Sequence, residues 1–216
     1  MTKESPSGAG ANRRERILQA AEMVFAQEGY HAATMRAIAA AAEAKLSLVV
    51  YHFESKLGLY REVFLRRQYL NEERREMLRA VDFDAPDAAH QLAAAFADPV
   101  LRLHESPTDV WFARLVLREA ADPSSHERGI IHELFDPMAQ EFIQAIVKVN
   151  PGRDREFYPW AYLFAVGALT SSANDARAGD LGRSAKKTVR DAHGGPDSPK
   201  GRHLKEFIAA GWAATD

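Results

Sequence analysis

The sequence predicts an all-α protein, and three observations support this. Apolar residues recur at helical spacing along most of the 216 residues, as on the helix face formed by Ile17, Leu18, Ala21, Val24 and Phe25. No stretch has the apolar–polar alternation of a half-buried strand. Turn residues separate the apolar runs, as at Gly29 and at Asn150-Pro151-Gly152.

The first helices are predicted as follows. Residues 1–12 are rich in Ser, Gly and Ala and are expected to form a disordered tail. An amphipathic helix follows over residues 13–27 and stops at Gly29. Thr34 is an N-cap candidate for a short helix over residues 35–42, and a break at 43–45 precedes another short helix over 47–53. Ser55 then caps a long helix expected from Lys56 to about Ala80, whose charged second half is predicted to be a solvated connector.

Five more helices are expected, over residues 87–104, 107–122, 124–149, 154–178 and 203–214. Pro99 is expected to kink or divide the first of them, and Pro137 lies inside the third. The basic, Gly- and Pro-rich residues 179–201 are predicted to be a mobile loop.

Composition narrows the class of protein. The chain has no cysteine, so a disulfide framework and thiolate chemistry are excluded. It has neither an N-terminal signal-peptide pattern nor an apolar run of about 18 residues, so a soluble cytoplasmic protein without a membrane partner is expected. Residues 1–67 hold ten Lys and Arg against seven Glu, or +3, whereas the whole chain is −2. This asymmetry suits a basic DNA-reading part attached to an acidic body.

Residues 34–59 contain the strongest functional signal. Two short helices are joined by a tight turn, and Tyr51, His52 and Lys56 gather at the exit of the second helix. This arrangement is typical of a helix-turn-helix, in which the second helix enters the major groove of DNA and neighbouring polar groups contact phosphates.

The same stretch resembles the DNA-binding domain of TetR-type transcriptional regulators. The resemblance covers roughly the first third of the chain and is carried by the pattern T-x-R-x-I-A-x-x-A followed by Y-H-F-x-S-K-x-x-L, here Thr34, Arg36, Ile38, Ala39, Ala42, Tyr51, His52, Phe53, Ser55, Lys56 and Leu59. A second segment, Phe112 to Ile146, is similar to the C-terminal domain of a TetR subgroup related to the regulator CecR. It shares an R-E-x-x-x-P piece, here Arg118, Glu119 and Pro123, and concerns fold and packing without implying a ligand.

The resemblance implies roles for individual residues. Phosphate contacts are expected from Thr34, Tyr51, His52 and Lys56, and base contacts from Arg36, Lys45, Leu46, Ser47 and Leu48. Half-buried packing of Tyr51 and a solvated Lys56 are the alternatives. Arg13 and Arg14 fit either solvated surface or additional phosphate or minor-groove contacts.

The chain departs from the family pattern at the turn and on the reading helix. Glu43 replaces the usual turn glycine, so a left-handed backbone there would be strained. Leu46 and Leu48 are apolar where polar readers are common, and Val50 replaces a frequent tyrosine. We therefore expect greater reliance on thymine methyl contacts and DNA shape.

The expected organisation is a disordered tail (1–12), a DNA-binding domain (13–59) and a helical effector-binding and dimerisation domain (60–216). The 154–178 helix and the last helix are the candidate homodimer contact; the alternative is that both are internal core. Aromatic and polar residues of the body could line a pocket for a small-molecule effector, and the candidates are Phe96, His104, Trp111, Arg114, Phe135, Trp160 and Phe164. The alternative for each of them is plain core packing.

The predicted function is a repressor that binds a palindromic operator in double-stranded DNA as a homodimer and is released by a small molecule. The alternative is a helical adaptor with a degenerate DNA-binding domain. An enzyme is not expected, because nucleophile-elbow, Walker and dinucleotide fingerprints are missing. His132-Glu133 lacks the second histidine of a zinc-binding helix, so no metal or other cofactor is predicted.

Overall fold

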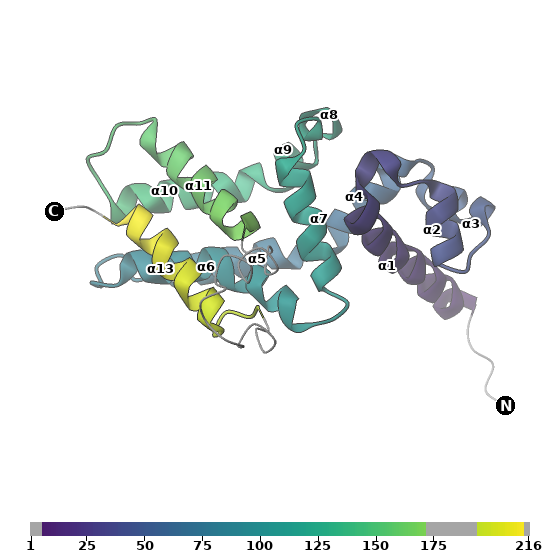
Figure 1. Cartoon of the computed structure of the whole chain (residues 1–216), viewed down its shortest axis with the longest axis horizontal. Helices are drawn as coiled ribbons and strands as arrows, with labels where there is room; N and C mark the ends of the chain where they lie inside the picture. The colour runs from purple at the N-terminus through teal and green to yellow at the C-terminus, as the bar shows by residue number, and fades with distance from the viewer. Residues whose placement is uncertain (1–5, 172–193, 214–216) are drawn as a thin grey trace, which may run out of the picture. The chain divides into compact units, whose positions relative to one another are not determined.

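The structure, a computed structural model, describes residues 6–171 and 194–213, with side chains from residue 12 onward. Every regular element in these two ranges is a helix, which confirms the predicted all-α class. The described helices form two compact units (Figure 1): one from residues up to 68 together with 111–134, and one from residues 69–110 together with those after 134. The expected boundary at residue 59/60 coincides with the edge of neither unit.

The first unit contains the helix-turn-helix and three later helices. Its elements are α1 (Pro6–Ala32), α2 (Met35–Ala41), α3 (Leu46–Phe53), α4 (Lys56–Arg66), α7 (Val110–Ala121), α8 (Ser125–Arg128) and α9 (Ile130–Leu134). α1 packs against α2 and α4, α2 packs against α3, and α4 packs against α9. The predicted apolar face of α1 is buried in full, and Ile38, Val49 and Phe53 close the core beneath the two short helices.

α1 is longer than predicted at both ends. It begins at Pro6, so residues 6–12 are helical rather than disordered, and residues 1–5 lie outside the described range. Pro at the first helical position already has a helical φ, and extending an existing helix is easier than nucleating one. Gly29 has φ 81 and ψ 166, a backbone that glycine adopts readily, and it kinks the helix where the sequence predicted a stop. The chain then continues helically to Ala32.

The helix predicted from Lys56 to about Ala80 is divided into α4 and α5 (Tyr69–Arg79). Arg67 leaves helical geometry with φ −101 and ψ 9, and its guanidinium donates to Glu22 and lies 5.5 Å from the ring centre of Phe112. These contacts hold the break in place. The second half is also not a solvated connector, because the side chains of Leu70, Asn71, Arg74 and Leu78 are buried.

The two prolines lie at different places in their helices. Pro99 lies inside α6 (Ala88–Arg102), which continues as one helix, so the expected division is wrong and the expected kink stays a prediction. The helix predicted over 124–149 consists instead of α8, α9 and α10 (Asp136–Val149), and Pro137 lies in the first turn of α10. Proline is favoured in a first turn because its missing N–H has no intrahelical partner to lose there. Gly129, with φ 68, separates α8 from α9.

The second unit packs around α6. Its elements are α5, α6, the short η1 (Leu103–Glu105), α10, α11 (Phe157–Ser171) and α13 (Pro199–Trp212). α5, α10 and α13 pack against α6, and α11 packs against α10 and α13. The rings of Phe142, Tyr162 and Trp212 meet Phe96 at centroid distances of 5.4–5.7 Å. The end of the predicted 154–178 helix and most of the predicted 179–201 loop fall in residues 172–193, outside the described ranges.

Among the described residues, no helix combines the length and the apolar character needed to cross a lipid bilayer.

Candidate DNA-binding surface and its supporting contacts

The turn between α2 and α3 has the geometry that the helix-turn-helix pattern predicted. Thr34 has an extended backbone, and its Oγ1 accepts a hydrogen bond from the Ala37 N–H at 3.1 Å, so it caps α2 as expected. Glu43 has φ 50, which places it in the left-handed region. The strain expected from replacing glycine at this position is therefore present in the turn.

α3 presents one buried face and one solvent-exposed face. Val49 and Phe53 are 0% and 4% exposed and anchor the helix to the core. The predicted base readers occupy the other side: Lys45, Leu46 and Ser47 are exposed, and Leu48 is half-buried. Tyr51 is 79% exposed, which excludes the half-buried packing considered as its alternative. The exposed face is largely apolar, a surface suited to contact with thymine methyl groups.

Arg36, Thr34 and His52 are also accessible. Arg36 is exposed on α2, and among the described residues its guanidinium has no hydrogen-bond or ion-pair partner. His52 is half-buried beside Tyr51, with ring centroids 5.3 Å apart. These side chains and the α3 residues belong to one continuous segment, residues 34–52, whose two helices are anchored by the buried side chains of Ile38, Val49 and Phe53.

Lys56 has a structural role in addition to the predicted phosphate contact. Its Nζ donates to the carbonyl oxygens of Tyr30 (2.9 Å), Ala33 (3.1 Å) and His31 (3.3 Å). The ammonium also lies 4.6 Å from the ring centre of Tyr30. An ammonium has three N–H donors, and all three have acceptors here, at the C-terminal end of α1. Phosphate contact by Lys56 stays a prediction, and it would require sharing or breaking one of these bonds.

The junction of α3 and α4 requires a close backbone approach. Ser55 Oγ accepts from the Gly58 N–H at 3.0 Å, so Ser55 caps α4 as predicted. A Cβ atom on Gly58 would lie 2.5 Å from the carbonyl oxygen of Phe53, closer than atoms tolerate. Gly58 thus allows the tight turn that fixes the direction of α3 relative to α4.

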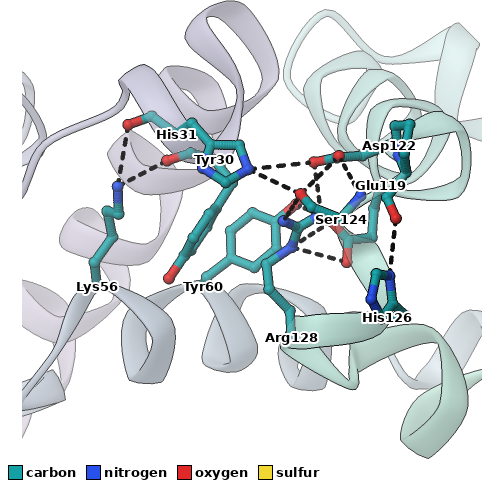
Figure 2. Close-up of polar contacts among 10 residues, drawn as sticks. Tyr30, His31, Lys56, Tyr60, Glu119, Asp122, Ser124, His126 and Arg128 are labelled. Atoms are coloured by element: carbon teal, nitrogen blue, oxygen red, sulfur yellow. Dashed lines mark hydrogen bonds and ion pairs between the residues drawn. The ribbon is translucent and has the colours of Figure 1, made fainter.

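A buried ion pair connects α4 and α1 to α7 and α8 (Figure 2). The Arg128 guanidinium donates to both carboxylate oxygens of Glu119, at 2.7–3.1 Å, and the two side chains are 4% and 1% exposed. Tyr60 on α4 donates its hydroxyl to Glu119 at 2.9 Å. Arg128 also lies 4.9 Å from the ring centre of Tyr30, on α1.

Further polar groups surround this pair. Arg128 donates to Asp122 (2.7 Å) and to Ser124 Oγ (3.0 Å), and Ser124 Oγ donates to Asp122 at 2.8 Å. The His31 Nε2 lies 2.9 Å from Ser124 Oγ, which connects the end of α1 to the α7–α8 turn (Figure 2). His31 immediately precedes the residues that lead into Thr34 and α2, so this network holds the chain where it enters the helix-turn-helix.

The environment fixes the charge state of the cluster. Burial, reinforced by the neighbouring Glu119 carboxylate, raises the pKa of Tyr60 far above its usual value, so its hydroxyl stays protonated and donates. Hydrogen bonds from the Ser124 N–H and hydroxyl, together with Arg128, lower the pKa of Asp122 to about 2. Burial alone would lower the pKa of Arg128, but its bonds to Glu119 and Asp122 raise it overall. Asp122 and Arg128 therefore stay charged, and Tyr60 stays protonated, throughout the physiological pH range.

Two regions of the chain match sequence profiles of known families. Residues 17–63 match the bacterial regulatory proteins of the tetR family, and residues 94–211 match the tetracyclin repressor-like C-terminal domain. The second match alone covers more than half of the chain. The chain belongs to the TetR family. The matched profiles do not name the CecR subgroup, so that finer resemblance stays a prediction.

A curated relative shares part of this sequence, and two solved structures share the fold. The chain is 38% identical over 82 residues to the HTH-type transcriptional repressor BepR of Brucella suis biovar 1 (strain 1330), and the match spans 38% of each chain. The TetR regulator PfmR of Thermus thermophilus has a similar fold, with a TM-score of 0.59, 17% identity and coverage of 93% of this chain and 99% of that one. A transcriptional regulator from Saccharomonospora viridis, solved in complex with choline, has a TM-score of 0.55 and 19% identity, with coverage of 92% of this chain and 96% of that one.

This TetR-family membership decides the class of protein. The family consists of DNA-binding transcriptional regulators rather than enzymes, as the sequence predicted. Within the described residues, no three His, Asp or Glu side chains come together as a possible metal site.

The predicted effector-pocket residues do not form one group. Phe96 is a core residue with 0% exposure. Trp111 and Arg114 belong to the first unit, where the guanidinium lies 4.9 Å from the indole, and the other five belong to the second. Trp160 and Phe164 stack at 5.8 Å but are 57% and 68% exposed. His104 lies in η1 and Phe135 directly precedes α10. A pocket formed by these seven residues stays a prediction.

Sequence reasoning missed the structural cluster of Tyr60, Glu119, Asp122 and Arg128. Part of the signal was visible, because the R-E-x-x-x-P piece contains Glu119. Its partners lie 9 residues away at Arg128 and 59 residues away at Tyr60, and single-sequence periodicity carries no information on such pairings.

Proposed function

We propose that this TetR-family protein is a ligand-responsive repressor that binds a palindromic operator as a homodimer and leaves it when a small molecule binds the body. The observation that carries the proposal is the exposed face of α3. Leu46, Ser47 and Tyr51 are presented to solvent there and Lys45 directly precedes the helix, while Thr34 and Ser55 cap the neighbouring helices α2 and α4. A protein acting on the chromosome in this way works in the cytoplasm. The repressor direction draws on BepR, a repressor by name.

Base reading is assigned to Arg36 and to the α3 residues. An exposed arginine can donate to O6 and N7 of one guanine, a contact that contributes about 1–3 kcal/mol of discrimination. Leu46 is 38% and Val50 45% exposed, so these apolar side chains are accessible for contact with thymine methyl groups. Thr34, Tyr51 and His52 flank these readers and supply phosphate contacts.

Homodimer formation is supported by an aromatic face on α11 and α13, which we define as Trp160, Leu163, Phe164 and Phe207. These side chains are 51–69% exposed. Trp160, Phe164 and Phe207 border a hollow of about 480 Å³ that is also lined by Ala161, Ala165 and Gly211. Contiguous exposed aromatic surface of this kind marks protein contact sites, and small residues allow helices to approach closely. A second copy of the same face is the proposed partner, through a two-fold axis.

The effector site is proposed within the second unit, lined by residues such as His104 and Phe135. A ligand that binds one dimer spacing more tightly than the other shifts the population away from the DNA-competent form by its differential affinity.

The proposal is tested by fluorescence anisotropy with duplexes from the DNA upstream of the gene, at two salt concentrations. We expect tight, salt-dependent binding to one such duplex and weak binding to a scrambled one. Small molecules extracted from the purified protein and identified by mass analysis should weaken the specific complex when added back. Binding that none of these compounds changes would contradict the ligand response while leaving DNA recognition in place.

A further inference from the structure

The basic residues of the DNA-binding part fall into two groups by their internal partners. Of the ten Lys and Arg in residues 1–67, the structure describes the side chains of nine. Six of them have acceptors within the protein: Arg14 on Glu62, Arg16 on the Ala42 carbonyl, Lys56 on three carbonyls, Arg61 on Glu133, and Arg66 and Arg67 on Glu22. Arg13, Arg36 and Lys45 have none among the described residues. Most of these basic side chains are therefore already paired with acceptors inside the protein.

Two of these three cations line one hollow. Arg13, from the first half of α1, and Lys45, which directly precedes α3, line a hollow of about 150 Å³ at the helix-turn-helix turn. Arg16, Glu43 and Leu48 complete its walls together with Ala42 and Ala44. Both cations are exposed, so an anion can reach them from solvent.

The other two charged residues of the hollow, Arg16 and Glu43, already contact each other. The Arg16 guanidinium donates to the Ala42 carbonyl at 2.8 Å and lies 3.7 Å from the Glu43 carboxylate. Arg16 therefore supports the turn and offsets the negative charge of Glu43. The two cations without partners among the described residues, Arg13 and Lys45, remain to attract one negative group.

We propose that Arg13 and Lys45 together bind one backbone phosphate of the duplex at the turn, on the flank of the groove that α3 reads. This contact is additional to the phosphate contacts of the TetR-type motif, and it makes Lys45 a phosphate ligand instead of a base reader. The inference rests on the proposed DNA binding. The occupant follows from charge complementarity and position, because the hollow adjoins Leu48 of the reading helix and duplex DNA carries a phosphate at every step.

The contact predicts a specific change in salt dependence. Each phosphate neutralised contributes about −0.9 to the slope of log affinity against log salt for B-DNA. Because the two cations share one phosphate, Arg13→Ala should make the slope shallower by up to about 0.9 per protomer and weaken binding by up to about 8-fold per protomer at ~0.1 M salt, and Lys45→Ala should do the same. Since a phosphate carries no sequence information, the loss should be equal for specific and unrelated duplexes. Arg13→Lys keeps the charge and should keep the slope.

The neighbouring arginine provides a matched control. Arg14→Ala removes the same charge one residue along, but the Arg14 guanidinium is paired with Glu62 and lies 5.3 Å from the Phe53 ring centre, so its loss should leave the salt slope unchanged. Circular dichroism melting of each variant checks that the DNA-binding part is folded. Glu43→Gln removes the carboxylate from the hollow and should tighten binding at low salt.

The outcomes separate the two hypotheses. If the wild-type protein binds no duplex in a salt-dependent manner, the proposed function fails. If the wild-type protein binds but Arg13→Ala leaves its slope unchanged, or weakens binding to one sequence alone, the phosphate contact is wrong and the proposed function stands.

Discussion

Glu43 is the residue at which local sequence and backbone disagree most clearly. It has φ 50 in the turn that positions α3, where an L residue other than glycine is disfavoured. Its side chain is 88% exposed, so packing contributes little to holding this conformation. The surrounding turn, with Arg16 bound to the Ala42 carbonyl, holds the strained backbone in place.

Relief of this strain should be measurable. A left-handed non-glycine residue costs about 1–2 kcal/mol, and the larger entropy of unfolded glycine offsets about 0.5–1 kcal/mol of any gain. Glu43→Gly should therefore raise the free energy of unfolding in urea by up to about 1.5 kcal/mol. Glu43→Gln, which removes the charge but keeps the Cβ, should leave it within about 0.5 kcal/mol. Equal stabilisation by both variants would show that charge, and not backbone strain, limits stability.

At the scale of elements, the ion pair of Glu119 and Arg128 holds α7 and α8 against α1 and α4. Both charges are buried, so their mutual neutralisation matters more than for surface pairs such as Arg79 and Glu72, which are 62% and 51% exposed. Tyr60 and Ser124 satisfy further hydrogen-bonding capacity of the pair. The helix-turn-helix and α7–α9 consequently belong to one compact unit.

Breaking this pair should be strongly destabilising. Arg128→Ala leaves the Glu119 carboxylate buried without its main partner, a change that typically costs about 3–5 kcal/mol in the free energy of unfolding. Arg114→Ala, in the same unit but exposed and in contact mainly with Trp111, should cost less than about 1 kcal/mol. The double variant Glu119→Gln with Arg128→Met removes both charges and should lose less than Arg128→Ala alone. A double variant at least as unstable as Arg128→Ala would contradict this electrostatic account.

The same scale shows how far the sequence predicts the structure. Amphipathic periodicity locates α1, α6, α7 and α13, and cap chemistry locates the starts of α2 and α4 at Thr34 and Ser55. The break between α4 and α5 escapes prediction because contacts of Arg67 with Glu22 and Phe112, 45 residues away in each direction, determine it. The burial of Arg74 in α5 escapes prediction for a similar reason. Its guanidinium lies 4.5 Å from the ring centre of Phe96, which is distant in the sequence, and this cation–π contact offsets part of the cost of burying the charge.

The candidate site also combines features that depend on local sequence, which can be predicted, with features that depend on distant contacts, which cannot. The exposure of Tyr51 and of the α3 readers follows from the spacing of Val49 and Phe53, which is local information. The three hydrogen bonds from Lys56 to carbonyls at the end of α1 depend on where that helix ends. A local motif identifies Lys56 as a phosphate ligand but contains no information on this second, structural role.

At the scale of the whole molecule, the account requires two copies of the chain. A single helix-turn-helix has a small footprint, and two copies read half-sites one helical turn apart, about 34–36 Å. The aromatic face of α11 and α13 is the part of the described surface best suited to bring them together.

Disrupting that face should separate the copies without unfolding either. Phe164→Glu together with Phe207→Glu places like charges on both copies of an otherwise apolar surface, at positions 68% and 69% exposed. We expect light scattering to report a dimer for the wild type and a monomer for the variant, with unchanged helical content and weakened operator binding. A control, Leu65→Glu, alters an exposed apolar residue on α4 and should leave the dimer intact. A variant that remains dimeric would move the interface elsewhere.

The central claim, that α2 and α3 read the sequence of duplex DNA, is tested most directly by measuring the affinity of the wild type and of Arg36→Ala for a selected operator and a scrambled duplex. The account predicts that the wild type strongly prefers the operator. It predicts that Arg36→Ala loses about 1–3 kcal/mol on the operator, with tolerance of substitution at one guanine and little change on the scrambled duplex. A wild-type protein that binds both duplexes equally, or an Arg36→Ala variant with undiminished preference, would contradict it.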